Sequence, residues 1–266
     1  MSAWLRFSHA GRTGFGIAEQ GSVRVHDGDM FGTCTPTGQV LAVSEVQVLT
    51  PCTPSKFIGL WNNFRAAAVK QGNAIPAEPL YFIKGANSYL PHGASIPLPR
   101  GYSGRIVYEG ELGVVIGRRV RDVEPEAAAQ AIFGYTCVND VTALDLITAD
   151  PAFAQWTRAK SWDGFGPFGP YIVTGSDVTL PDVTGLDPAE LVIRTLVNGR
   201  ERQNYPASDM IFAPAQIVSA LSRELTLEPG DLITCGTSLG VGVFKPGMTV
   251  DVVIEGVGTL SNTLQG

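Results

Sequence analysis

The sequence predicts a mostly β fold of the α+β class. Its 31 glycines and 18 prolines are scattered through 266 residues as single turn signals, a pattern typical of many short strands. Predicted strands outnumber predicted helices, and the two do not alternate regularly as they do in parallel α/β folds. No G-x-G-x-x-G motif lies between a strand and a helix. A doubly wound nucleotide-binding fold is therefore disfavoured.

The first 54 residues are predicted to form a small β domain. Short alternating segments, such as residues 4–7 and 22–26, are separated by turns that contain glycine. The segment TPCTPS at residues 50–55 has two prolines and no periodicity, which predicts a linker. We therefore expect a boundary between residues 1–54 and a larger unit of residues 55–266.

The larger unit is predicted to contain many strands and few helices. Apolar runs predict strands at residues 56–60, 80–83, 106–117, 135–138, 191–197, 231–235, 249–254 and 258–264. Helical patterns cover residues 63–71, 125–132, 142–160 with a break at Pro151, and 214–225. Residues 86–104 and the glycine-rich segment 161–170 are expected to be irregular loops.

Composition and charge exclude several classes of function. The 19 lysines and arginines and 25 aspartates and glutamates give a net charge of -6, with no basic cluster for nucleic acid. No apolar run approaches the roughly 20 residues that span a bilayer, and the first residues lack the apolar segment of a secretory signal. The four cysteines show no CxxC spacing, so neither disulfides nor a zinc site is indicated. We expect a cytoplasmic protein without nucleic-acid or membrane partners.

Three carboxylates are candidate metal ligands. Glu109 and Glu111 lie two residues apart in an otherwise apolar segment, so on a strand both side chains point to one face. Two neighbouring carboxylates repel one another unless a cation compensates them, and a hard divalent ion is the simplest compensation. Asp140 follows an apolar strand and completes a set of three oxygen ligands for Mg²⁺ or Mn²⁺. The alternative is an edge strand with two glutamates that face solvent.

Three further residues are candidates for binding a substrate. Lys160 lies in apolar, glycine-rich surroundings and is a suitable partner for carboxylate or enolate oxygens, although a surface lysine is the common alternative. Thr237, in the turn CGTSLGVG, offers a hydroxyl and nearby backbone N–H groups to an anion. His92 lies in the irregular segment 86–104 and is a candidate to approach the site. No G-x-S-x-G motif supports a hydrolase triad.

Five separated motifs together resemble the fumarylacetoacetate hydrolase family. They are YEGELGVVIG, GYTCVNDVTALD, RAKSWDGFGPFGP, PGDLITCGTSLGVG and IEGVGTL, and the resemblance covers residues 55–264. The resemblance implies a catalytic domain with a mixed β-sandwich roll, commonly a homodimer. It also implies Mg²⁺ or Mn²⁺ held by Glu109, Glu111 and Asp140, with Lys160 and Thr237 holding the oxo-acid end of the substrate.

The sequence departs from the family's pattern at three positions. The segment FIGLWNNFRAAAV is similar to the family's G-L-N-Y-x-x-H, which puts Asn63 at a substrate-binding position and Ala67 in place of the histidine that activates water. In the segment NDVTALDLI, Leu144 and Ile147 replace an arginine and a glutamine. These changes resemble the branch of 2-hydroxyhepta-2,4-diene-1,7-dioate isomerases and 5-oxopent-3-ene-1,2,5-tricarboxylate decarboxylases.

Three functions are therefore weighed for a small 2-oxo acid substrate. The first is hydrolytic cleavage of a C–C bond in an acylpyruvate or β-diketo acid through a metal-stabilised enolate, with Lys160 and Glu109 as catalytic residues and His92 or Glu78 as the replacement base. The second is decarboxylation or keto–enol isomerisation of an unsaturated 2-oxo dioic acid in aromatic catabolism. The third is a noncatalytic metal-binding homologue.

Overall fold

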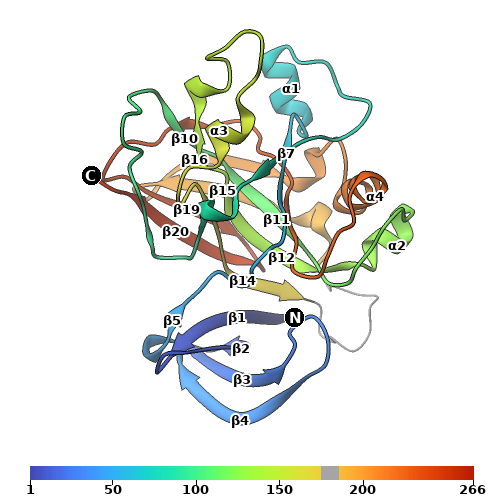
Figure 1. Ribbon diagram of the computed structural model, residues 1–266, viewed down its shortest axis with the longest axis vertical. Coiled ribbons are helices and arrows are strands. Elements are labelled where there is room, and N and C mark those ends of the chain that lie inside the picture. Colours follow the sequence, from blue (N-terminus) through green and yellow to red (C-terminus); the bar gives the residue numbers. More distant parts are fainter. Residues whose placement is uncertain (175–185) are drawn as a thin grey trace.

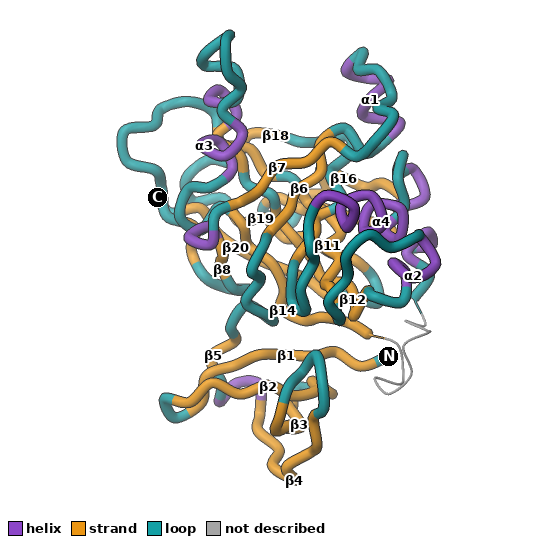
Figure 2. The backbone as a smooth tube through the Cα atoms, turned by 45° about the vertical axis from the view of Figure 1, so that its right-hand side comes forward, coloured by secondary structure: helices purple, strands orange, loops and turns teal. Residues whose placement is uncertain are grey.

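The computed structural model describes residues 1–174 and 186–266, and it is mostly β, as the sequence predicts (Figures 1 and 2). The N-terminal strands are β1 (Ser2–His9), β2 (Arg12–Glu19), β3 (Ser22–Gly28), β4 (Cys34–Ala42) and β5 (Gln47–Val48). The remaining strands are β6 (Phe57–Trp61), β7 (Leu80–Lys84), β8 (Tyr89–Leu90), β9 (Ser95–Ile96), β10 (Ile106–Tyr108), β11 (Gly110–Ile116), β12 (Ile132–Asn139), β13 (Thr142–Ala143), β14 (Gly166–Thr174), β15 (Val192–Val197), β16 (Arg200–Pro206), β17 (Leu232–Thr234), β18 (Gly242–Val243), β19 (Thr249–Ile254) and β20 (Gly258–Leu264). The helices are α1 (Arg65–Gln71), α2 (Pro125–Ala129), α3 (Trp156–Lys160) and α4 (Pro214–Glu224).

The described strands form three sheets. The largest has the order β4-β3-β2-β1-β14-β12-β11-β17-β6-β7, with β5 paired to β1 and β8 paired to β14. A second sheet has the order β16-β15-β19-β20-β9, and a small third one the order β13-β10-β18. The N-terminal strands lie below the body of the molecule and join it where β1 pairs with β14 (Figure 1). The division of the chain between residues 54 and 55 stays a prediction.

The main core lies between the first two sheets. Strand β11 is buried along its whole length and packs against β15 and β19 of the second sheet within one apolar cluster. A strand covered on both faces needs an apolar sequence, which explains the run LGVVI after Glu111. Gly110 is required because a Cβ atom there would lie 2.0 Å from the hydroxyl oxygen of Thr195 on β15. The second sheet thus packs directly against β11, the strand that carries Glu111.

Three sequence predictions are corrected by the structure. The single strand expected at residues 106–117 is two strands, β10 and β11, which separate at Glu109. Most of residues 142–160 is not α-helical, because β13 pairs with β10, residues Leu144–Leu146 form one 3-10 turn, and α3 is the only α-helix in this range. The expected loop at residues 161–170 is partly strand, because β14 begins at Gly166 and bulges around Pro170 to continue pairing with β12. Such long-range pairings override local patterns.

The helices are short, and the one expected at residues 125–132 ends at Ala129. In contrast, the helix expected at residues 214–225 is confirmed as α4. Within the described ranges 1–174 and 186–266, no helix combines the length and hydropathy that crossing a bilayer would require.

A buried aspartate holds the start of β6 in place. Asp231, just before β17, accepts hydrogen bonds from the Ser55 hydroxyl (2.6 Å) and from the backbone N–H groups of Lys56 (2.9 Å) and Glu228 (2.8 Å). Its side chain is fully buried, and the Lys56 ammonium lies 2.7 Å from its second oxygen. These contacts hold the start of β6 against β17, its parallel neighbour.

We expect Asp231→Ala to lower the free energy of unfolding by about 2–4 kcal/mol, because it leaves buried donors without an acceptor. Lys56→Met is the matched control, since it removes only a partly exposed cation and is expected to cost about 1 kcal/mol or less. Chemical denaturation of both variants measures the difference. Equal losses would mean that the buried hydrogen bonds contribute little.

Candidate metal and substrate site

Three carboxylates converge at one point in the structure. Glu109 lies between β10 and β11, Glu111 is on β11, and Asp140 directly follows β12. One oxygen from each lies within 4.8 Å of the others. Glu111 and Asp140 are buried, whereas 14% of the Glu109 side chain is exposed. The convergence predicted from the sequence is confirmed, and the site opens to solvent beside Glu109.

Backbone pairing between β11 and β12 sets this arrangement. Gly110 is paired with Asn139, so the residues on either side of each are brought together. The Asp140 N–H donates to the Glu109 carbonyl (2.8 Å), and the Glu109 N–H donates to the Asn139 side-chain oxygen (3.0 Å). The positions of Glu109 and Asp140 therefore follow from main-chain geometry and one asparagine.

Two lysines neutralise part of this negative charge. The Lys160 ammonium donates to Glu109 (2.7 Å) and to Asp140. The Lys84 ammonium donates to the other oxygen of Asp140 (2.5 Å) and to the Val141 carbonyl (3.3 Å), and its side chain is fully buried. Sequence reasoning missed Lys84. The available signal was a lysine at the end of the apolar strand LYFIK, where a cation needs a buried partner.

Burial and neighbouring charges shift the pKa values of this cluster. Burial, together with the charges of Asp140 and Glu109, raises the pKa of Glu111 well above its ordinary value. Burial likewise raises the pKa of Glu109, although Lys160 opposes the effect. At Asp140, burial acts in the same direction, but the two ammonium groups outweigh it and hold the pKa below its ordinary value. Glu109 and Glu111 thus lack a fully compensating cation.

The same two effects, burial and attraction by carboxylates, shift the pKa values of the two lysines in opposite directions. At Lys160, burial disfavours the charged form, but the three surrounding carboxylates outweigh it and raise the pKa. At Lys84, burial is the larger effect and lowers the pKa, against the opposing attraction of Asp140. Lys160 is therefore the cation that stays protonated and able to donate hydrogen bonds at neutral pH.

This donor set fits a divalent metal ion. With all five groups ionised, three carboxylates and two ammonium groups would leave one negative charge uncompensated in a buried place, which a bound cation would neutralise. All the candidate ligand atoms are hard carboxylate oxygens, which Mg²⁺ and Mn²⁺ prefer. Glu111 is also oriented from behind, because one of its oxygens accepts from the Thr234 hydroxyl (2.5 Å) and the Gly236 N–H (2.8 Å). The roles of Glu109, Glu111 and Asp140 as ligands stay predictions.

Thr237 lies beside the carboxylates, on the turn that follows β17. Its hydroxyl donates to the Gly110 carbonyl (3.1 Å) and accepts from the side-chain amide of Gln203 (2.9 Å). The oxygen of the same Gln203 side chain accepts from the Gly110 N–H (3.0 Å), and Tyr205 donates to the Gly110 carbonyl. Two residues of β16 thus join the Thr237 turn to the strand that carries Glu111. Sequence reasoning did not identify Gln203 or Tyr205.

Asn63 and His92 make contacts with the backbone. The Asn63 side-chain amide donates to the carbonyls of Cys235 (2.9 Å) and Phe212 (3.2 Å), and its oxygen accepts from the Phe212 N–H (2.9 Å). It therefore holds the end of β6 beside the Thr237 turn. His92 accepts from the Ser261 N–H on β20 (3.1 Å), and burial lowers its pKa. Substrate binding by Asn63 and His92 stays a prediction.

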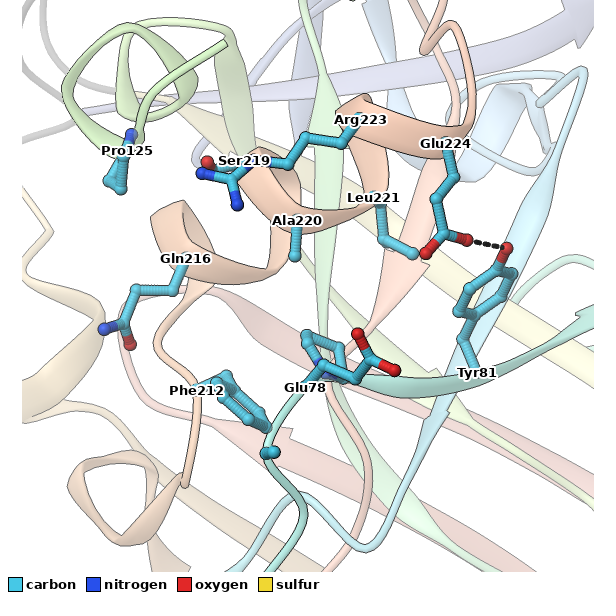
Figure 3. A pocket seen from close by; sticks show the side chains of 12 residues that line it. Glu78, Tyr81, Pro125, Phe212, Gln216, Ser219, Ala220, Leu221, Arg223 and Glu224 are labelled. Carbon is cyan, nitrogen blue, oxygen red and sulfur yellow. Dashed lines mark hydrogen bonds between the residues drawn. The ribbon is translucent and has the colours of Figure 1, made fainter. Parts of the chain in front are cut away.

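The candidate replacement base Glu78 lines a different pocket. This pocket, of about 300 Å³, lies between the start of β7 and helix α4, and Figure 3 shows Glu78 in it near Phe212 and Tyr81. Its lining includes none of the three carboxylates or two lysines of the cluster. Ala67, at the position of the family's histidine, is buried within α1.

Comparisons with known proteins identify the family of both parts of the chain. Residues 56–265 match the family described as fumarylacetoacetate hydrolase C-terminal, and residues 3–51 match the family described as Rv2993c-like, N-terminal. The oxaloacetate tautomerase YisK of Bacillus subtilis is 36% identical over 234 residues, which cover 84% of this chain and 74% of that protein.

Two solved structures are also similar. A 2-hydroxyhepta-2,4-diene-1,7-dioate isomerase from Mycobacterium marinum is 36% identical, with a TM-score of 0.87, over 100% of this chain and 98% of that chain. A fumarylpyruvate hydrolase from Pseudomonas aeruginosa, in complex with Mn²⁺ and pyruvate, is 29% identical, with a TM-score of 0.71, over 82% and 91% of the two chains. The chain belongs to the fumarylacetoacetate hydrolase family.

Proposed function

We propose that the protein is a divalent-metal-dependent enzyme that interconverts the keto and enol forms of a 2-oxo acid. The observation that carries this proposal is the cluster in which three converging carboxylates outnumber the two lysines that pair with them. A bound Mg²⁺ or Mn²⁺ supplies Lewis-acid polarisation of the substrate's 2-oxo acid oxygens. The tautomerase and isomerase among the similar proteins support the same class of reaction.

Lys160 has the central role among this chain's own residues. Its ammonium group is buried, and its raised pKa keeps it protonated at neutral pH. It is therefore positioned to donate a hydrogen bond to the substrate oxygen on which negative charge develops, in a place where water competes weakly. Lys84 holds Asp140 in place from the other side, so that Asp140 does not need Lys160 as its only cation.

The residue at position 67 favours isomerisation over hydrolysis. Hydrolytic C–C cleavage needs a base that activates water, and the alanine at this position cannot serve as one. Of the two replacement bases considered, His92 is hydrogen-bonded to β20 and Glu78 lines the pocket beside α4. Keto–enol exchange requires no nucleophilic water. A proton leaves the carbon next to the 2-oxo group and a proton is added to the enolate oxygen, and solvent can accept and return these protons once the enolate charge is stabilised. Hydrolysis and decarboxylation are the competing outcomes of the test.

The test is an assay of EDTA-treated protein restored with Mg²⁺ or Mn²⁺ and offered oxaloacetate, acetylpyruvate and fumarylpyruvate, with ultraviolet detection and products identified by mass. We expect metal-dependent tautomerisation without cleavage. Lys160→Met is expected to lower kcat/KM about 100-fold or more, because it removes a donor to the developing charge. Lys70→Met, on the exposed face of α1, is the control.

Each other outcome has a definite meaning. Release of pyruvate and a second acid would identify a hydrolase with a base elsewhere, and carbon dioxide would identify a decarboxylase. Absence of any turnover by metal-loaded protein would favour the noncatalytic homologue.

A second prediction concerns metal affinity. Glu111→Gln is expected to weaken Mn²⁺ binding at least about tenfold, because a neutral amide replaces one of three charged ligands. Glu224→Gln is the matched control, since Glu224 lies on α4 and accepts from Tyr81 beside the separate pocket in Figure 3. Isothermal titration calorimetry measures both. Unchanged affinity in Glu111→Gln would exclude this carboxylate as a ligand.

A third prediction concerns the pH dependence of metal binding. Since a metal ion binds the ionised carboxylates, and the pKa values of Glu109 and Glu111 are raised, metal and protons compete for the same oxygens. Metal affinity is therefore expected to rise with pH through the raised pKa values, with protons released on binding. Calorimetry in buffers of different ionisation enthalpy counts those protons. A binding enthalpy that does not depend on the buffer would contradict this.

A further inference from the structure

A row of aromatic side chains leads away from the Lys160 ammonium group. The Lys160 nitrogen lies 4.8 Å from the centre of the Phe82 ring. Phe82 stacks on Trp156, with ring centres 5.5 Å apart and planes inclined by only 11°. Trp156 in turn contacts Trp61, with ring centres 5.8 Å apart. We call Phe82, Trp156 and Trp61 the aromatic row.

The aromatic row connects the buried cluster with solvent. Lys160 and Phe82 are buried, Trp156 is partly exposed, and Trp61 is 39% exposed. The three rings come from β7, from the first residue of α3 and from the last residue of β6, elements that lie together at one end of the molecule in Figures 1 and 2. A ligand held at Lys160 and extending outward would therefore pass along these rings.

The inner ring of the aromatic row is fixed by packing against a glycine. A Cβ atom on Gly59 would lie 2.4 Å from the tip of the Phe82 ring, so this ring rests directly on the backbone of β6. The outer two rings, Trp156 and Trp61, differ from Phe82 because part of their surface is exposed to water. Removing large aromatic surface from water is favourable, and a flat ligand group that stacked on these rings would do so.

The chemistry of the aromatic row selects the kind of group that would bind there. The two lysines of the site lie at the carboxylate cluster, at the inner end of the row, where the 2-oxo acid group is placed. The ring faces carry partial negative charge, which disfavours a second carboxylate, and their large apolar surface favours contact with an apolar planar group. A conjugated or aryl group is planar and makes offset-stacked contacts with tryptophan.

We propose that the aromatic row binds the tail of the substrate and selects 2-oxo acids whose tail is planar and apolar, such as an aryl group. Trp61 and Trp156 are then the residues that determine specificity. This inference rests on the proposed function, because it takes the 2-oxo acid end of the ligand to lie at the carboxylate and lysine cluster.

The test measures binding rather than turnover. Isothermal titration calorimetry on the Mg²⁺-loaded protein compares phenylpyruvate with pyruvate, which share the 2-oxo acid group and differ in the ring. The wild-type protein is expected to bind phenylpyruvate about tenfold or more tightly. Trp61→Leu and Trp156→Leu are expected to reduce that preference several-fold and to leave pyruvate affinity unchanged. Phe153→Leu is the control, since Phe153 is an exposed aromatic residue outside the row.

The outcomes separate the two proposals. If pyruvate binds and phenylpyruvate binds no better, the inference about the tail is overturned while the proposed function stands. If neither acid binds to the metal-loaded wild-type protein, the proposed function fails. Trp61 is the outermost ring and contacts Trp156. A Trp61→Leu variant that lost affinity for both acids equally would show a structural role for the row and overturn the inference.

Discussion

Burying three carboxylates at one point is the constraint on which the rest of this structure depends. Ionised groups at this separation repel strongly once water is removed, and each loses its hydration. The fold compensates the carboxylates only in part. Lys84 and Lys160 donate to Asp140 and Glu109, whereas Glu111 receives hydrogen bonds from neutral donors. Because the compensation is partial, binding of a further cation at this site would be electrostatically favourable.

The surrounding sheets hold this unfavourable cluster together. β11 and β12 supply the carboxylates through their register, and β15 approaches so closely that only glycine fits at position 110. The polar groups of Gly110 are then satisfied by β16, through Gln203 and Tyr205. The side chains that bear charge are few, and a larger number of neutral contacts fixes where they point. This is the usual way in which a site is made rigid before a ligand arrives.

Local sequence signals identified what depends on short spacing, and they missed what depends on tertiary contact. The i, i+2 spacing of Glu109 and Glu111 and the position of Asp140 at a strand end were sufficient to predict their convergence. Lys84 was missed because its function comes from a partner 56 residues away. Residues 142–160 carry a helical pattern, yet pairing of β13 with β10 prevails over it. The homodimer implied by the family resemblance stays a prediction.

The pairing of β1 with β14 protects an edge of the largest sheet. Among the described residues, three pairs join these strands, and Trp4 of β1 lies in the same apolar cluster as Phe168, Ile172 and Val138. The N-terminal strands therefore shield the edge of a sheet that also bears Asp140. A chain lacking them would present an unpaired strand edge beside uncovered apolar side chains, which is the combination that promotes intermolecular aggregation. In this protein the N-terminal strands thus cover one edge of the strands that carry Glu111 and lead to Asp140.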